Sequence, residues 1–180
     1  MQDPWRIAMS TDHPNGSSFR AYPEIIALLM DRERRKEMLA SVPSGLKERT
    51  TLAELDREYT LNDIAIITRA APARMLGLKN KGQLGVGADA DVTIYQPNDD
   101  IQRMFELPRY VLRAGEIVVE DGEIRSNEEG RLFRVSPSYD DGAIADIREW
   151  FEQYYTIRFR NYPVDEQTLQ ANEVIGPATS

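Results

Sequence analysis

The chain has 180 residues, of which 41% are hydrophobic and 29% charged, a composition typical of a folded globular protein. Its net charge of −8 disfavours nucleic acid and anionic membranes as partners, because both require Lys and Arg to displace their counterions. The absence of cysteine excludes disulfides, thiolate zinc sites and a cysteine nucleophile, and we expect a cytoplasmic protein.

The N-terminal part predicts a buried strand followed by helices. Residues 7–9 form a short apolar run that ends in the polar loop 10–16, which suits a strand carrying functional groups at its end. Pro23 then marks the start of a helix whose apolar residues recur at helical spacing, and we expect it to end near residues 43–45. No apolar stretch reaches the roughly 20 residues that a membrane helix needs.

Two capping-box patterns follow, Thr51 with Glu54 and Thr60 with Asp63, and each predicts the start of a helix. The second helix is the more apolar. Because proline cannot continue a regular helix, we expect two helices joined at Pro72.

The periodicity then changes to that of strands. Residues 92–95 alternate in the strand manner, and the runs 111–113, 116–120 and 123–125 are separated by tight turns, which predicts a small antiparallel meander. Farther along, residues 143–154 have helical spacing and residues 156–160 suit a strand. Residues 165–180 lack periodicity and are interpreted as an extended tail or docking arm.

The chain has a single histidine, His13. Imidazole is the commonest metal ligand and the commonest general base near neutral pH. A multi-histidine zinc site therefore cannot be built from this chain, and a hydrolase with two metals would draw its other ligands from elsewhere. We accordingly expect a fragment of a larger protein.

Three ordered segments resemble the end of an amidohydrolase: Ser10-Thr11-Asp12-His13-Pro14, residues 70–78 (AAPARMLGL) and residues 81–92 (KGQLGVGADADV). In that family a (β/α)₈ barrel carries one or two metals, its eighth strand ends in an aspartate, and a small β-sandwich follows. The resemblance implies that Asp12 is this aspartate.

A narrower resemblance rests on residues 11–16 (TDHPNG), Phe19, residues 22–26 (YPEII) and residues 155–163 (YTIRFRNYP). These are similar to the A subunit of formylmethanofuran dehydrogenase and of the related bacterial formyltransferase/hydrolase complex. The likeness implies a dinuclear zinc centre that handles the formyl group between formate and the amine of methanofuran. The family's His-x-His pair, bridging carboxylated lysine and later histidines are absent from this chain.

The expected fold class is α+β: the remnant of the C-terminal end of a (β/α)₈ amidohydrolase barrel, then a small β-sandwich and a C-terminal helix. The expected domains are residues 1–78 for the barrel end, 79–135 for the sandwich and 136–180 for the helix, strand and tail.

The resemblance assigns Asp12 two roles, as a metal ligand and as the catalytic group that takes a proton from the attacking water and delivers it to the leaving amine. From the residues alone, a turn-forming aspartate before His-Pro is the commoner explanation. His13 and Asn15 are placed next to the substrate, with an ordinary polar loop as the alternative. Gly16 permits either the close approach of a ligand or a plain turn.

The expected function is that of a zinc-dependent subunit fragment acting on the formyl-amide of methanofuran in one-carbon metabolism. Zinc belongs to the complete subunit, and this chain alone is expected to bind none and to be inactive. Expected partners are the remainder of the barrel and the other subunits of the complex, with self-association into a homo-oligomer. Two alternatives remain open: a non-catalytic assembly module, suggested by the aromatic residues after Trp150, and a fragment of another cyclic-amide amidohydrolase.

Overall fold

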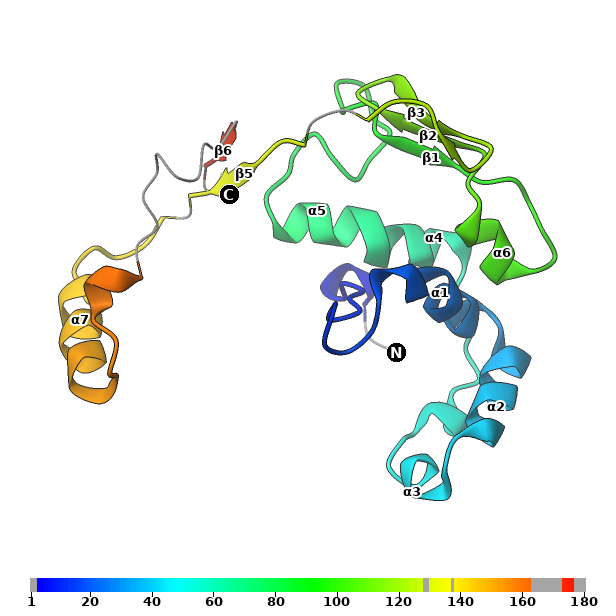
Figure 1. Ribbon diagram of the computed structural model, residues 1–180, viewed down its shortest axis with the longest axis horizontal. Coiled ribbons are helices and arrows are strands. Elements are labelled where there is room, and N and C mark those ends of the chain that lie inside the picture. Colours follow the sequence, from blue (N-terminus) through cyan, green and yellow to red (C-terminus); the bar gives the residue numbers. More distant parts are fainter. Residues whose placement is uncertain (1–2, 128–129, 137, 163–172, 177–180) are drawn as a thin grey trace. The chain divides into compact units, whose positions relative to one another are not determined.

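The computed structural model describes residues 3–127, 130–136, 138–162 and 173–176. The chain splits into two compact units, Met1–Glu128 and Glu129–Ser180. The first contains helices and an antiparallel sheet, and the second a helix and a pair of parallel strands (Figure 1). This mixture of helices and strands agrees with the expected α+β class, whereas the three-part division at residues 78 and 135 stays a prediction. Within the described residues, no helix is long and apolar enough to cross a membrane.

The strand predicted over residues 7–9 is not formed. After the 3-10 turn η1 (Pro4–Arg6), the backbone is extended but belongs to no sheet. Burial still alternates along this segment, because Ile7 and Met9 are half-buried and Thr11 is buried, while the residues between them are exposed. The N–H of Met9 donates to the helix carbonyl of Ile67 at 3.1 Å. A strand requires a neighbouring strand, and the described part of the chain supplies none beside this segment.

The single helix predicted from Pro23 is two helices. The 3-10 turn η2 (Phe19–Ala21) leads into α1 (Tyr22–Met30), and α2 (Arg32–Ser41) follows after one residue. That residue, Asp31, is extended (φ −124°, ψ 111°), and its carboxylate accepts the N–H of Arg34 at 2.9 Å. Asp31 therefore ends α1 and caps α2, as aspartate commonly does at a helix start. The short helix α3 (Ser44–Lys47) comes next.

Only one of the two predicted capping boxes forms. Thr60 and Asp63 exchange side-chain and backbone hydrogen bonds at the start of α4 (Leu61–Ala65), as predicted. Thr51 precedes only the 3-10 turn η3 (Leu52–Glu54). Its backbone (φ −94°, ψ 7°) is not the extended conformation that an N-cap residue adopts, and the N–H of Leu52 donates instead to the hydroxyl of Thr50 at 3.2 Å.

The helix that contains Pro72 is continuous, contrary to the prediction of two helices joined there. α4 runs through the π-helical turn η4 (Ile66–Ala70) into α5 (Ala71–Met75), and Pro72 is the second residue of α5. A proline ring normally clashes with the preceding helical turn and lacks a donor. The wider i→i+5 spacing of η4 accommodates it without ending the helix.

The predicted antiparallel meander is confirmed. Its four strands pair in the order β1-β2-β3-β4, with Tyr110 opposite both Ile94 and Glu120. The tight turns between β2 and β3 and between β3 and β4 place Ala114 and Asp121 at positive φ, each followed by a glycine. A β-sandwich stays a prediction, because these strands form one sheet. The strands are β1 (Val92–Ile94), β2 (Tyr110–Arg113), β3 (Glu116–Glu120) and β4 (Glu123–Ile124).

A small apolar core holds the first unit together. Its buried members are Ile26 of α1, Ile64 of α4, Ile67 of η4 and Phe105. Phe105 comes from α6 (Ile101–Glu106), a helix that begins at the N-cap Asp100 and was not predicted. Many large apolar side chains of this unit remain exposed, among them Leu61, Leu76, Leu84 and Val86.

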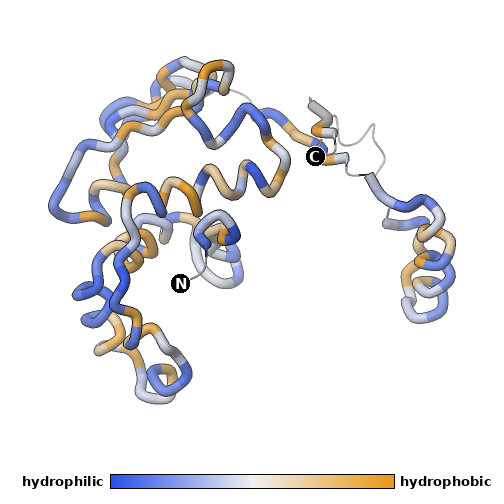
Figure 2. The backbone as a smooth tube through the Cα atoms, turned by 180° about the vertical axis from the view of Figure 1, so that it is seen from behind, coloured by the Kyte–Doolittle hydropathy of each residue, from blue (hydrophilic) through white to orange (hydrophobic). Residues whose placement is uncertain are grey.

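The second unit combines a helix with two parallel strands. β5 (Phe133–Val135) pairs with β6 (Glu173–Ile175), and α7 (Ala143–Tyr154) has the predicted bounds. Hydrophobic and hydrophilic residues alternate along α7 in Figure 2. The strand predicted over residues 156–160 is wrong, because the 3-10 turn η5 (Phe159–Asn161) forms there. Of the predicted tail, residues 165–172 and 177–180 lie outside the described residues.

Candidate functional site

Asp12 lies at the end of the extended segment and has an exposed side chain. Its backbone is left-handed, with φ 51°, a conformation that aspartate and asparagine adopt more readily than most residues. The loop holds it from both sides, because the N–H of Asp12 donates to the Ser10 hydroxyl at 3.2 Å and its carbonyl accepts the N–H of Gly16 at 2.8 Å. The Asp12 carboxylate is therefore exposed to solvent, directly after the extended segment.

His13 and Asn15 follow Asp12 in the same loop, and both are exposed. The His13 and Phe19 rings form a T-shaped pair with centroids 5.0 Å apart. A Cβ on Gly16 would lie 2.9 Å from the Thr11 carbonyl oxygen, so the loop's own backbone closely approaches this residue. The close approach that requires glycine is thus made by the loop's own backbone, in agreement with the turn interpretation.

The donor set of this loop does not by itself fit a dinuclear zinc centre. One carboxylate and one imidazole fall short of the four donors that zinc usually takes. Across the described residues, no group of three or more His, Cys, Asp and Glu side chains is placed to hold a metal ion. Asp12 can supply one ligand, and the other donors of such a centre would have to come from outside these residues.

A cavity of about 1030 Å³ lies between the continuous helix formed by α4, η4 and α5 and the sheet of the first unit. Leu61 and Ile66 line it from the helix, and Leu76 from the position just after α5 ends. Thr93 of β1 and Tyr95, which follows β1, line the opposite side. None of Asp12, His13 or Asn15 lines it. The predicted loop and the cavity are therefore separate features.

Sequence patterns did not point to this cavity, because its polar contacts join residues far apart in the chain. The Arg69 guanidinium donates to the Tyr95 hydroxyl at 2.9 Å and lies 5.9 Å from the centre of that ring. These residues are 26 positions apart, and neither belongs to a recognisable motif.

Lys81 and Asp91, which line the cavity, form ion pairs that also include Asp89. Lys81 donates to Asp89 at 2.8 Å and also contacts Asp91, whose carboxylate accepts the Ala114 N–H at 2.9 Å. The hydrogen bond to Asp89, followed by that to Asp91, raises the pKa of Lys81. The Lys81 hydrogen bond lowers the pKa of Asp91. These contacts of Lys81, Asp89 and Asp91 attach the 81–91 loop to the β2–β3 turn. They support a structural role for Asp89 and Asp91.

The chain belongs to the amidohydrolase family, whose model matches residues 1–119. The family predicted from the ordered motifs is thus confirmed, and the likeness to individual relatives continues beyond the residues that the family model covers.

Two curated relatives are similar over most of the chain. The A subunit of the formyltransferase/hydrolase complex Fhc from Methylorubrum extorquens is 41% identical over 157 residues, which are 87% of this chain and 28% of the relative. Protein FwdA from Methanocaldococcus jannaschii is 37% identical over 182 residues, 94% of this chain and 32% of the relative. The chain therefore spans about a third of the relatives it matches.

A solved structure shows the same likeness. The crystal structure of the formyltransferase/hydrolase complex FhcABCD from Methylorubrum extorquens with methylofuran contains a chain that is similar at 34% identity and a TM-score of 0.77. The alignment covers 99% of this chain and 33% of that one. The predicted resemblance to A subunits of this type is confirmed.

Proposed function

We propose that the chain is the C-terminal part of an A-type subunit that hydrolyses or forms the formyl-amide of methanofuran in one-carbon metabolism, with zinc bound in the complete subunit. The observation that carries the proposal is the match to the Fhc complex chain over 99% of these residues. The chain covers only a third of that protein, so the proposal includes the remaining barrel as an essential partner and assigns no turnover to this chain alone.

Asp12 is the residue of this chain that we propose to take part in the reaction. Hydrolysis adds water to the formyl carbon and breaks its bond to nitrogen, which yields formate and a free amine. A carboxylate beside the attacking water can accept one proton and return it to the leaving nitrogen. The exposed side chain of Asp12, on a loop fixed at both ends, supports this role.

The test is to co-express this chain with the part of the Methylorubrum extorquens relative that it does not match, and to measure formate released from the formyl-amide substrate. Asp12→Asn keeps the shape and the left-handed backbone but cannot accept the proton, so turnover should fall by about 10²-fold or more. Asp121→Asn is the matched control, because Asp121 is also exposed with φ 49°. Equal turnover in the two variants would remove Asp12 from the mechanism, and absence of turnover in the unmodified assembly would contradict the proposed function.

A further inference from the structure

Gly16 lies in the same loop as Asp12, and the space around it, rather than its backbone conformation, requires a glycine. It is not among the glycines with positive φ, so a left-handed backbone does not explain the residue. A Cβ on Gly16 would, however, lie 2.9 Å from the Thr11 carbonyl oxygen, and the backbone would have to shift to admit it. What lies next to Gly16 therefore decides its role.

The Asp12 side chain is the second group that lies against Gly16. A Cβ on Gly16 would lie 3.0 Å from the Asp12 Cβ and 3.3 Å from Asp12 Oδ2, one of the two carboxylate oxygens. The bare Cα of Gly16 thus leaves room for this carboxylate, and a larger residue would crowd it. An aspartate side chain can adopt three staggered χ1 rotamers, so the space beside Gly16 favours the one in which Oδ2 lies over the glycine.

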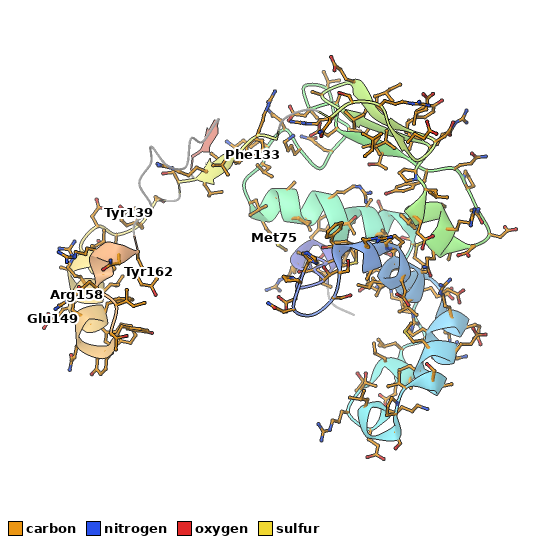
Figure 3. The ribbon with its side chains drawn as sticks, viewed as in Figure 1. Met75, Phe133, Tyr139, Glu149, Arg158 and Tyr162 are labelled. Atoms are coloured by element: carbon orange, nitrogen blue, oxygen red, sulfur yellow. The ribbon has the colours of Figure 1, made fainter. Side chains whose placement is uncertain are left out.

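Hydrogen bonds fix the backbone of Asp12 on both sides of this contact. The Ser10 hydroxyl accepts the Asp12 N–H at 3.2 Å, and the Asp12 carbonyl accepts the Gly16 N–H at 2.8 Å. The segment before the loop is hydrogen-bonded, through the N–H of Met9, to the helix that ends at Met75 (Figure 3). The Asp12 carboxylate is therefore held by local contacts on a segment that is attached to the first unit.

We propose that Gly16 and Ser10 are positioning residues that orient the Asp12 carboxylate for proton transfer, an inference that rests on the proposed function. Gly16 acts through the space that it leaves beside Oδ2, and Ser10 acts through its hydrogen bond to the Asp12 N–H. A general base must lie within hydrogen-bond reach of the proton that it accepts. Misplacement of such a group by about 1 Å can lower a rate by about 10²-fold.

Gly16→Ala in the co-expressed assembly is the first test. The kcat for formate release should fall by about tenfold or more, whereas KM should change by less than about threefold, because the groups that contact the substrate are kept. Gly85→Ala is the matched control. Its Cβ would also lie 2.9 Å from an oxygen, but this oxygen is the end of the flexible Gln83 side chain, which can move away. The control should change kcat by less than about twofold.

Ser10 provides a test that introduces no crowding. Ser10→Ala removes the acceptor of the Asp12 N–H and should lower kcat by about threefold to tenfold, as expected for the loss of one hydrogen bond. Ser10→Thr keeps a hydroxyl at an exposed position, so it should restore kcat to within about twofold of the unmodified assembly. A Ser10→Thr variant that loses as much kcat as Ser10→Ala would overturn the role of the hydroxyl.

The double variant Gly16→Ala with Asp12→Asn separates positioning from a general disturbance of the loop. A positioning residue acts only through the group that it orients, so Gly16→Ala should leave the residual rate of Asp12→Asn unchanged. The proposal fails if Gly16→Ala lowers both rates by the same factor. It also fails if the kcat of Gly16→Ala equals that of the Gly85→Ala control.

NMR of the full chain without the co-expressed part measures the orientation of Asp12 independently of turnover. Side-chain couplings of Asp12 should report one χ1 rotamer in the unmodified chain, and a different rotamer or an average in Gly16→Ala. An average over rotamers in the unmodified chain, or the same rotamer in both chains, would overturn the proposal. Because this measurement needs no formate release, its failure and failure of the proposed function are separate results.

Discussion

Asp12 combines a left-handed backbone with an exposed carboxylate. A non-glycine residue in this conformation costs on the order of 1 kcal/mol or more, and such residues concentrate at functional sites. Hydrogen bonds to Ser10 and from Gly16 offset part of that cost. The geometry therefore supports testing Asp12 first, and it explains why asparagine, which tolerates the same backbone, is the suitable replacement.

Arg35 is a buried cation of the first unit, with 8% of its surface exposed. Its guanidinium donates to the carbonyls of Leu28, Leu55 and Arg57 at 2.6, 3.0 and 2.9 Å. It therefore joins α1 to the 55–57 segment, which has no regular structure. Truncating Arg35 leaves three carbonyls without this donor.

Arg35→Ala should lower the free energy of unfolding by about 2 kcal/mol, because hydrogen bonds to a charged donor are lost in a covered site. Urea unfolding followed by circular dichroism measures the change. Arg32→Ala is the matched control on the same helix, since the Arg32–Asp56 ion pair is exposed and should contribute less than about 1 kcal/mol. A similar loss in both variants would contradict the role given to Arg35.

At the scale of elements, the start of α4 depends on one carboxylate. Asp63 accepts the Thr60 N–H at 2.9 Å and the Thr60 hydroxyl at 2.8 Å, and Arg57 donates to it at 3.2 Å. The hydrogen bond from the Thr60 backbone, followed by that from its side chain, lowers the pKa of Asp63. The charged form is thus favoured in the folded chain.

This lowered pKa predicts a stability difference that depends on pH. In the unfolded chain an aspartate titrates near about 3.9, so the stabilisation is complete above that pH and is lost as pH falls through the lower folded pKa. The urea midpoint of Asp63→Asn should lie below that of the unmodified chain at pH 7, and the gap should shrink below about pH 4.

Asp56→Asn serves as the control for this titration, because Asp56 is 77% exposed in its pair with Arg32. It should differ little from the unmodified chain at any pH. A gap for Asp63→Asn that is the same at pH 3 and pH 7 would show that the capping box is not stabilised by its charge.

At the scale of the whole molecule, a small core coexists with many exposed apolar side chains. Leu84 has 80% of its surface exposed to solvent, and Leu61 has 59% exposed. Apolar surfaces of this extent usually mark contact with another chain or segment. The chain also matches only about a third of each relative. Both observations support the proposal that the first unit packs against the remaining part of the barrel.

The zinc content of the isolated chain tests that proposal directly. Because Asp12 supplies one ligand at most, metal analysis after gel filtration should find far less than one tightly bound zinc per chain. The same measurement on the co-expressed assembly should find stoichiometric zinc. A dinuclear centre already present in the isolated chain would contradict the proposed division of ligands.

Features that depend on local chemistry could be predicted from the order of the residues. The Thr60–Asp63 capping box, the meander with its Ala-Gly and Asp-Gly turns, and the bounds of α7 follow from short-range hydrogen bonds, backbone preferences and periodicity. The ordered motifs likewise predicted the family, which the comparisons confirm. The position of Asp12 after an extended segment could be predicted, whereas its catalytic role stays a prediction.

Features that depend on distant partners could not be predicted, because they arise from packing between segments. Residues 7–9 have the pattern of a strand, but the part of the chain that the structure describes offers them no strand to pair with. The π-helical turn before Pro72 allows the helix to continue. The cavity and the carbonyl contacts of Arg35 join residues with no local signal. Local patterns record what a segment prefers, and packing between segments decides which preferences are met.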